Sequence, residues 1–239
     1  MRDERGFTLI ELLVAMSVTM VLMGAVYMAV NTAQRHSSGI ERKVMAQQDV
    51  KPALDLMAME IGMASYNPML ATNLWVNPPG SADGCGSAAA NQNYRGIQEA
   101  TANSITVEMD IGGPSGSASD GSLGDPNEMI RYNYVTGTAN EYITRSTDCT
   151  GGNQPFLGAA SGNTRAVRVI NNTLGLPVFR YYDGTGTEIA ATALPAAIPN
   201  IRRIDITLAV ETDQVDPNTN LRRRLIYSTS VIPRNHAIS

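Results

Sequence analysis

The residue arrangement most able to do chemistry lies near the start of the chain, where a glutamate interrupts an apolar run. The run extends from Phe7 to Val30, and Glu11 is its one charged side chain. As a helix, a run of this length spans about 36 Å at roughly 1.5 Å per residue, which is enough to cross the hydrocarbon core of a bilayer. A carboxylate inside hydrocarbon costs roughly 2.5–3.5 kcal/mol on insertion scales. We therefore expect Glu11 to have a function, one that requires a positively charged partner wherever the carboxylate is buried.

The rest of the chain has no arrangement typical of an enzyme. Its two histidines, His36 and His236, are expected to face solvent near the ends of the domain, which leaves little for general-base catalysis. The segment 112–116 is rich in glycine but lacks the lysine of a phosphate-binding loop. We therefore expect no enzymatic activity and no resident cofactor.

A short polar segment precedes the apolar run. The run is longer than the about 7–15 apolar residues of a secretory signal peptide, and no Ala-x-Ala site closes it. The residues Gly6-Phe7-Thr8-Leu9-Ile10-Glu11 resemble the cleavage and methylation signal of type IV prepilins and type II secretion pseudopilins. The resemblance implies that a prepilin peptidase cuts between Gly6 and Phe7, that the new Phe7 amine is N-methylated, and that Glu11 is used in filament assembly.

The resemblance also implies partners and a location. In a filament, the Phe7 amine of a neighbouring subunit would be the positive partner of Glu11, and the pair would set the axial register between subunits. The plainer alternative is that Glu11 lies at the level of the lipid headgroups. The implied partners are the prepilin peptidase, a major pilin, other minor pilins and an inner-membrane assembly platform. The implied location is the inner membrane, crossed once with the carboxyl-terminal domain in the periplasm, and then the pilus on the cell surface.

The chain divides into four expected segments. Together they predict the α+β fold class: a long amino-terminal helix with a bend, packed on an antiparallel β-sheet in a pilin-like domain. The segments are a leader at 1–6, a transmembrane and filament-core helix at 7–30, a periplasmic continuation of the helix at 31–66, and a β-rich globular domain at 67–239.

The helix continuation carries an apolar face. Val50, Leu54, Met57 and Ile61 recur at spacings of four, three and four, which predicts a helix face that packs on the domain. Pro52 interrupts this pattern and removes a backbone donor. We expect a bend near residues 49–52, or else a restarted helix that is capped by Asp49.

Alternating polar and apolar residues predict the strands of the domain. The segments at 68–103 and 150–163 are instead expected to be loops, because glycine, proline and other turn residues punctuate them. The last two predicted strands are long and would form an antiparallel hairpin. The predicted strands are 104–109, 129–134, 141–145, 164–171, 178–182, 201–211 and 221–231.

The two cysteines, Cys85 and Cys149, are expected to form a disulfide. The resemblance places the domain in the periplasm, where disulfides persist. Closing so long a loop would stabilise the fold by roughly 4 kcal/mol at most in the chain-entropy model. The alternative, two free thiols that bind a metal, lacks histidines at a ligand spacing.

One loop has the composition of a cation site. Asp213, Asp216, Asn218 and Asn220 cluster within residues 212–220, and oxygen ligands at such density can hold calcium, as in loops of some pseudopilins. The spacing does not match an EF-hand. A turn rich in Asp and Asn is the favoured interpretation, and calcium is the alternative.

The charge balance argues against nucleic acid as a partner. The formal net charge is −4, which does not favour polyanion binding across the whole surface. Arg222-Arg223-Arg224 is a local basic run, but alternate side chains of a strand point to opposite faces. We therefore expect a membrane and protein partners, and no nucleic acid.

Motifs beyond the apolar run resemble those of PilW-like minor pilins and, more loosely, type II secretion J pseudopilins. They favour a minor pilin that primes filament assembly or lies at the pilus tip. The alternatives are a type II secretion minor pseudopilin and, from a different class, an adhesive or ligand-binding tip module. The motifs are Leu54-Asp55, Glu60 to Tyr66, Ile130-Arg131-Tyr132, Thr144-Arg145-Ser146, Leu176 to Gly184 and Val231 to Asn235.

Overall fold

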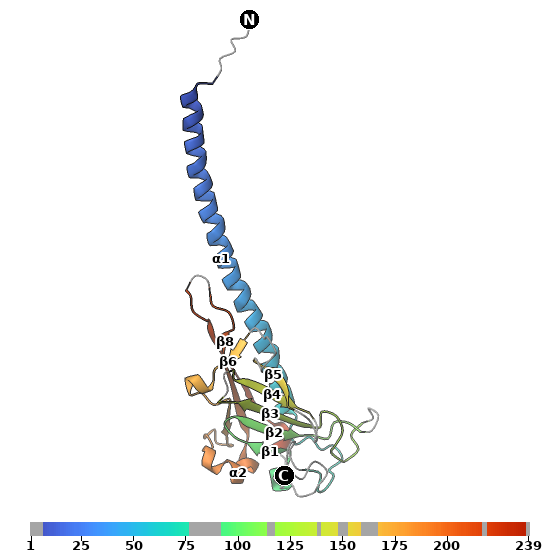
Figure 1. Cartoon of the computed structure of the whole chain (residues 1–239). Helices are drawn as coiled ribbons and strands as arrows, with labels where there is room; N and C mark the ends of the chain where they lie inside the picture. The colour runs from blue at the N-terminus through green and yellow to red at the C-terminus, as the bar shows by residue number, and fades with distance from the viewer. Residues whose placement is uncertain are drawn as a thin grey trace.

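The molecule consists of one long helix whose carboxyl-terminal half packs on two antiparallel β-sheets (Figure 1). Helix α1 (Leu9–Gly62) has 54 residues, and its amino-terminal half projects away from the β domain. The expected α+β architecture is therefore confirmed, with two sheets in place of one. This computed structural model describes residues 7–76, 92–113, 118–137, 140–147, 153–158, 167–216 and 219–237.

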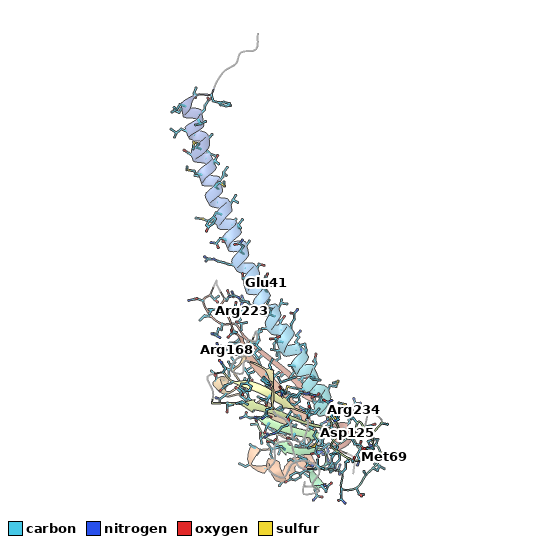
Figure 2. The ribbon with its side chains drawn as sticks, turned by 45° about the vertical axis from the view of Figure 1, so that its right-hand side comes forward. Glu41, Met69, Asp125, Arg168, Arg223 and Arg234 are labelled. Carbon is cyan, nitrogen blue, oxygen red and sulfur yellow. The ribbon has the colours of Figure 1, made fainter. Side chains whose placement is uncertain are left out.

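Pro52 lies inside α1 without ending it. The helix is continuous from Leu9 to Gly62, so the alternative in which Asp49 caps a second helix is wrong. A proline in a helix interior removes one backbone hydrogen bond. Pro52 is exposed, so its ring leaves the packed face of the helix undisturbed. α1 is helical through residues 49–52, where the sequence predicts a bend. Figures 1 and 2 show the helix curving along its length.

The first sheet has five antiparallel strands in the order β1-β2-β3-β4-β5. β3 and β4 form the hairpin that the sequence predicts, and Gly137 between them has a φ of 77°, which glycine adopts without steric cost. The strands are β1 (Ile97–Ala100), β2 (Ser104–Glu108), β3 (Met129–Val135), β4 (Tyr142–Ser146) and β5 (Gln154–Leu157).

The second sheet is built around its longest strand, β8 (Arg203–Thr212). β6 (Val167–Val169) and β7 (Phe179–Tyr182) pair with one edge of β8, and β9 (Arg224–Val231) pairs with the other. The predicted late hairpin is thus confirmed as β8 and β9. The remaining elements are short: η1 (Gln92–Tyr94), η3 (Asn172–Leu174), η4 (Ala191–Ala193), α2 (Leu194–Ala197), η5 (Ile198–Asn200) and η6 (Arg234–Ala237).

The core lies between α1 and the two sheets. Val50, Leu54, Met57 and Ile61 are buried, which confirms the predicted packing face of the helix. They belong to one hydrophobic cluster that includes inward-facing residues of both sheets, and α1 contacts β5, β8 and β9. The carboxyl-terminal half of α1 is therefore an integral part of the β domain.

Two strands lie where the sequence predicts loops. β1 falls within residues 68–103 and β5 within residues 150–163. Each has four residues, which is too short for a clear alternation. In β1, the buried Ile97 and Ala100 stand on either side of two half-buried polar residues, and pairing with β2 supplies the hydrogen bonds. Pairing in the folded sheet, rather than a local pattern, determines these two strands.

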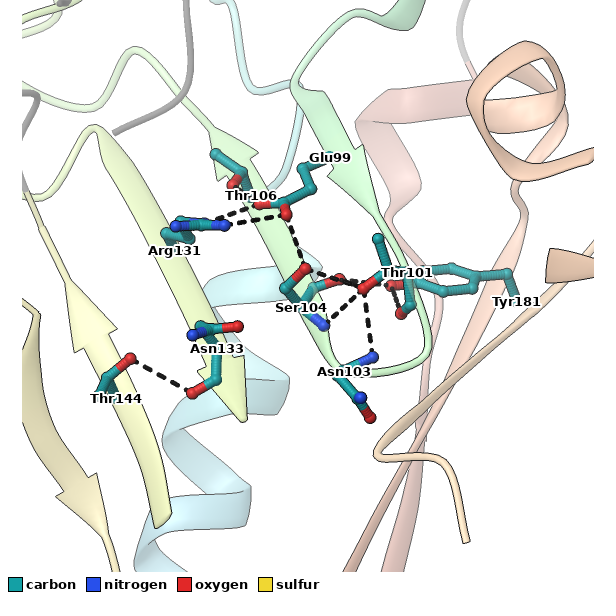
Figure 3. Close-up of polar contacts among 9 residues, drawn as sticks. All are labelled: Glu99, Thr101, Asn103, Ser104, Thr106, Arg131, Asn133, Thr144 and Tyr181. Carbon is teal, nitrogen blue, oxygen red and sulfur yellow. Dashed lines mark hydrogen bonds and ion pairs between the residues drawn. The ribbon is translucent and has the colours of Figure 1, made fainter. Parts of the chain in front are cut away.

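A polar network holds the edge of the first sheet together (Figure 3). Arg131 binds the carboxylate of Glu99 with two hydrogen bonds, of 2.7 and 3.0 Å, and the hydroxyls of Ser104 and Thr106 donate to the same carboxylate. Burial alone would raise the pKa of Glu99, but these hydrogen bonds and the Arg131 charge outweigh it and lower the pKa. The Tyr181 hydroxyl of β7 donates to the Ser104 carbonyl of β2 at 3.2 Å, so the network also joins the two sheets.

Candidate functional site

The first turn of α1 is closed by a reciprocal cap. Thr8 is the N-cap, and its hydroxyl oxygen accepts from the Glu11 backbone N–H at 3.4 Å. The Glu11 carboxylate accepts in turn from the Thr8 backbone N–H and from the Thr8 hydroxyl, each at 2.9 Å. This is a capping box, and a carboxylate here also complements the positive end of the helix dipole. The Thr-x-x-Glu spacing is the sequence signature of such a cap, which is not among the predictions made from the sequence.

The predicted cleavage site adjoins this cap. Phe7 is 91% exposed and directly precedes Thr8, whereas Gly6 lies outside the described residues. The structure thus places Glu11 within one helical turn of Phe7. It does not test cleavage or methylation, which remain predictions.

The amino-terminal half of α1 presents apolar side chains to its surroundings on every face. Every residue from 7 to 30 is exposed, and the most apolar window of α1 has a mean hydropathy of 2.2 with none of it buried. Two of its hydroxyls are satisfied within the helix, because Ser17 donates to the Leu13 carbonyl and Thr19 to the Ala15 carbonyl. By length and composition, this half can cross a membrane.

Ion pairs form in the loop at residues 212–220, for which calcium binding is the alternative to a turn rich in Asp and Asn. Asp213 accepts from Arg168 at 2.8 Å and from Arg222 at 3.5 Å. Asp216 is buried and accepts from Arg223 at 2.8 Å. The acids that would bind a cation are therefore bound to guanidinium groups. Within the described part of the chain, no three His, Cys, Asp or Glu side chains gather as a metal site, and Asn218 lies outside that part.

The same loop fastens the β8–β9 hairpin to α1. Arg42 donates to the Val215 carbonyl, and a Cβ on the buried Gly39 would lie 3.5 Å from an Asp216 oxygen. The third arginine of the basic run, Arg224, lies 3.8 Å from Glu211. All three arginines therefore face acids of their own chain, which supports a structural role for the run.

A buried ion pair joins α1 to the first sheet. Glu60 is 5% exposed, and its carboxylate accepts from Nε of Arg145 at 3.0 Å, from Nη2 of Arg145, and from the Tyr132 hydroxyl. Burial and the adjacent Glu60 charge raise the pKa of Tyr132, so the phenol stays protonated as a donor. The pair is not among the sequence-based predictions, although Glu60 lies three residues after Met57 on the predicted packing face.

A second buried polar contact contradicts the expectation for His236, which is fully buried rather than solvent-facing. Its Nε2 lies 2.9 Å from the Ile198 carbonyl, which accepts only, so Nε2 carries the proton. Nδ1 then accepts from the Ser65 hydroxyl at 2.9 Å, and Ser65 accepts from the Gly96 N–H at 3.0 Å. Side chains from both ends of the domain thus meet in its interior. His36 is exposed, as expected.

Cys85 and Cys149 both lie outside the described residues, so their disulfide remains a prediction.

Comparison with known proteins bears on the first turn. The family model of the prokaryotic N-terminal methylation motif matches residues 1–27. The chain carries a prepilin-type methylation motif. This motif covers the predicted cleavage position, the capping box with Glu11, and most of the exposed apolar half of α1. The structure is also similar to a type IV-like pilin from Thermus thermophilus, with a TM-score of 0.39 and 11% identity over 80% of this chain and 97% of that chain. No curated protein sequence matches the chain.

Proposed function

We propose that this chain is a minor pilin of a type IV pilus, which is cleaved after Gly6 and methylated on Phe7, and which primes filament assembly or lies at the pilus tip. The observation that carries the proposal is the prepilin-type motif on a helix whose apolar half is wholly exposed in the single chain. Monomeric soluble proteins rarely expose so large an apolar surface. Lipid would cover it before assembly, and the helices of neighbouring subunits would cover it in a filament.

The capping box supports a specific role for Glu11. Cleavage after Gly6 would leave the Phe7 amine one residue before Thr8. The Glu11 carboxylate already accepts a hydrogen bond from the Thr8 backbone N–H. Before assembly, the cap partly satisfies the carboxylate. In the filament, the amine of a neighbouring subunit would replace that partner and fix the axial register between the two helices.

The orientation and the partners belong to the same proposal. The chain would cross the inner membrane once with its β domain in the periplasm, and would meet the prepilin peptidase, the assembly platform, a major pilin and other minor pilins. A PilW-like subunit is the preferred class because of the motifs that follow the apolar run. A type II secretion pseudopilin would share every feature of the first turn and differ in the filament that it enters.

Replacing Glu11 by glutamine removes the negative charge and keeps the helix cap. Glutamine is also found at this position of capping boxes, so the helix should still begin at Thr8. We expect normal membrane insertion and cleavage, but about tenfold or greater loss from filaments, because an amine left without its buried carboxylate is strongly destabilising. Immunoblots of sheared filaments and membranes measure this ratio, with Thr8→Ser as the cap-preserving control. Incorporation of Glu11→Gln at the level of Thr8→Ser would show that the charge is not needed.

A further inference from the structure

An open cleft of about 630 Å³ lies beyond the carboxyl-terminal end of α1. The segment that follows the helix lines most of it, and Gln92, Arg95 and Asn235 complete it. Figure 2 places Met69 and Arg234, sequence neighbours of lining residues, at the end of the molecule opposite the start of α1. The cleft has a volume typical of a small-ligand site and lies far from the apolar half of the helix.

Backbone strain is concentrated around this cleft. Of the six non-glycine residues with positive φ in the described part of the chain, four line it. They are Ser65 at 67°, Leu70 at 53°, Asn73 at 57° and Arg95 at 54°. The left-handed region costs a non-glycine residue roughly 1–2 kcal/mol, and such residues cluster at ligand sites.

Hydrogen bonds within the chain already hold the lining of the cleft in place. The Asn67 side-chain amide bonds both backbone groups of Ala71, at 2.9 and 3.0 Å. Gln92 does the same for Trp75, at 2.7 and 3.3 Å. These amide pairs hold the segment after α1 in one conformation, so little ordering is left for a ligand to impose.

The unused groups of the cleft determine which ligand would fit. Tyr66 is 41% exposed, and neither its hydroxyl nor the Trp75 indole N–H has a hydrogen-bond partner within the described residues. The side chains of Thr72, Asn73 and Asn235 are likewise unpartnered there. A side-chain amide can both donate and accept hydrogen bonds, and so can a hydroxyl group of a ligand, so the two can pair. Among its described lining residues the cleft has no carboxylate, which does not favour a cation.

We propose that this cleft binds a carbohydrate ring. The C–H face of a sugar ring would lie on an aromatic side chain, because the π face carries partial negative charge. The hydroxyls around its edge would bond to Asn73, Asn235 and Thr72. Arg95, which donates to the His236 carbonyl at 2.8 Å, supplies a positive charge that suits neutral and acidic sugars alike. The site belongs to a single subunit, so it stands whether or not the chain enters a filament.

Trp75 makes the proposal directly measurable, because it is the one tryptophan of the chain. The full chain in detergent micelles is titrated with the methyl glycosides of glucose, N-acetylglucosamine and N-acetylneuraminic acid while Trp75 emission is recorded. We expect a saturable change with at least one glycoside. Tyr66→Ala and Asn73→Gly should each weaken the apparent affinity by about fivefold or more.

The matched control is Asn220→Gly. Asn220 is exposed and has a φ of 55°, much like Asn73, but it lies in the β8–β9 loop. Glycine accepts this conformation at both positions, so neither variant adds strain. Tyr66→Phe keeps the aromatic ring and should keep most of the affinity. It provides a second test at the same position if Tyr66→Ala does not fold.

Three results would overturn the proposal. One is the absence of a saturable change with all three glycosides. Another is an equal affinity for Asn73→Gly, Asn220→Gly and the unaltered chain. The third is a response to trialanine in place of the sugars, which would identify a peptide site.

Discussion

Replacing Glu60 by alanine is expected to lower the free energy of unfolding of the β domain by about 3–5 kcal/mol. The substitution leaves the Arg145 guanidinium and the Tyr132 hydroxyl without their shared acceptor at the junction of α1 and β3–β4. The Arg145 side chain is 21% exposed, so water reaches it only in part. An uncompensated charge at such a site costs more than the pair contributes, which explains why one truncation should have so large an effect.

Urea unfolding of the full chain in micelles, followed by Trp75 emission, measures this loss. The matched control is Glu188→Ala, because Glu188 and Arg180 form an exposed pair at 3.9 Å, and such pairs contribute about 0–1 kcal/mol. Replacing Glu60 and Arg145 together by leucine should recover much of the loss, since no charge is then stranded. Equal effects of Glu60→Ala and Glu188→Ala would show that the junction is held by apolar contacts alone.

Acidification from pH 7 to pH 4 is expected to remove about 3 kcal/mol of stability through His236 alone. Burial, aided by the nearby charges of Arg95 and Arg202 and opposed by the Ile198 hydrogen bond, lowers the pKa of His236 from 6.5 to about 4. The unfolded chain therefore binds a proton at His236 below pH 6.5, and the folded chain does so only below about pH 4. Stability from this residue is complete above pH 6.5 and is lost progressively as the pH falls to 4.

The difference between the unaltered chain and His236→Gln isolates this effect. Carboxyl groups titrate in the same window, and burial raises the pKa of Glu108, which acts in the opposite direction on stability. Subtracting the two pH profiles cancels these shared contributions. We expect the difference to grow below pH 6.5, so that His236→Gln loses less stability on acidification. Parallel profiles from pH 7 to pH 4 would contradict the neutral, buried His236.

The parts of the fold that the sequence predicts are those with long, regular patterns. β8 and β9 alternate over many residues, and the apolar face of α1 keeps its period from Val50 to Ile61. The sequence does not predict β1 and β5, because each strand is too short to show a periodic pattern and its formation depends on pairing with a neighbouring strand. The continuous helix through Pro52 likewise follows from packing that no local propensity reveals.

The residues of the candidate site also differ in how far the sequence predicts them. Glu11 is visible in the sequence because a single charge stands out in an apolar run, and the Thr8 spacing would have revealed its cap. The sequence predicts a buried Glu60 only if a charged side chain on the packing face of the helix is taken to be buried. His236 carries no such signal, because its partners Ser65 and Ile198 are brought to it by the fold.

Mass spectrometry of the amino-terminal peptide, run separately on sheared surface filaments and on the membrane fraction, tests whether the chain is a processed minor pilin. We expect a peptide that begins at a methylated Phe7, present in filaments at a small fraction of the main pilin. Gly6→Ala should yield only the uncut peptide, in membranes alone. A processed peptide confined to membranes would instead favour a pseudopilin or a subunit that stays at the base. An intact Met1 leader in both fractions would rule out a processed pilin, since the apolar half of α1 would then be a plain anchor.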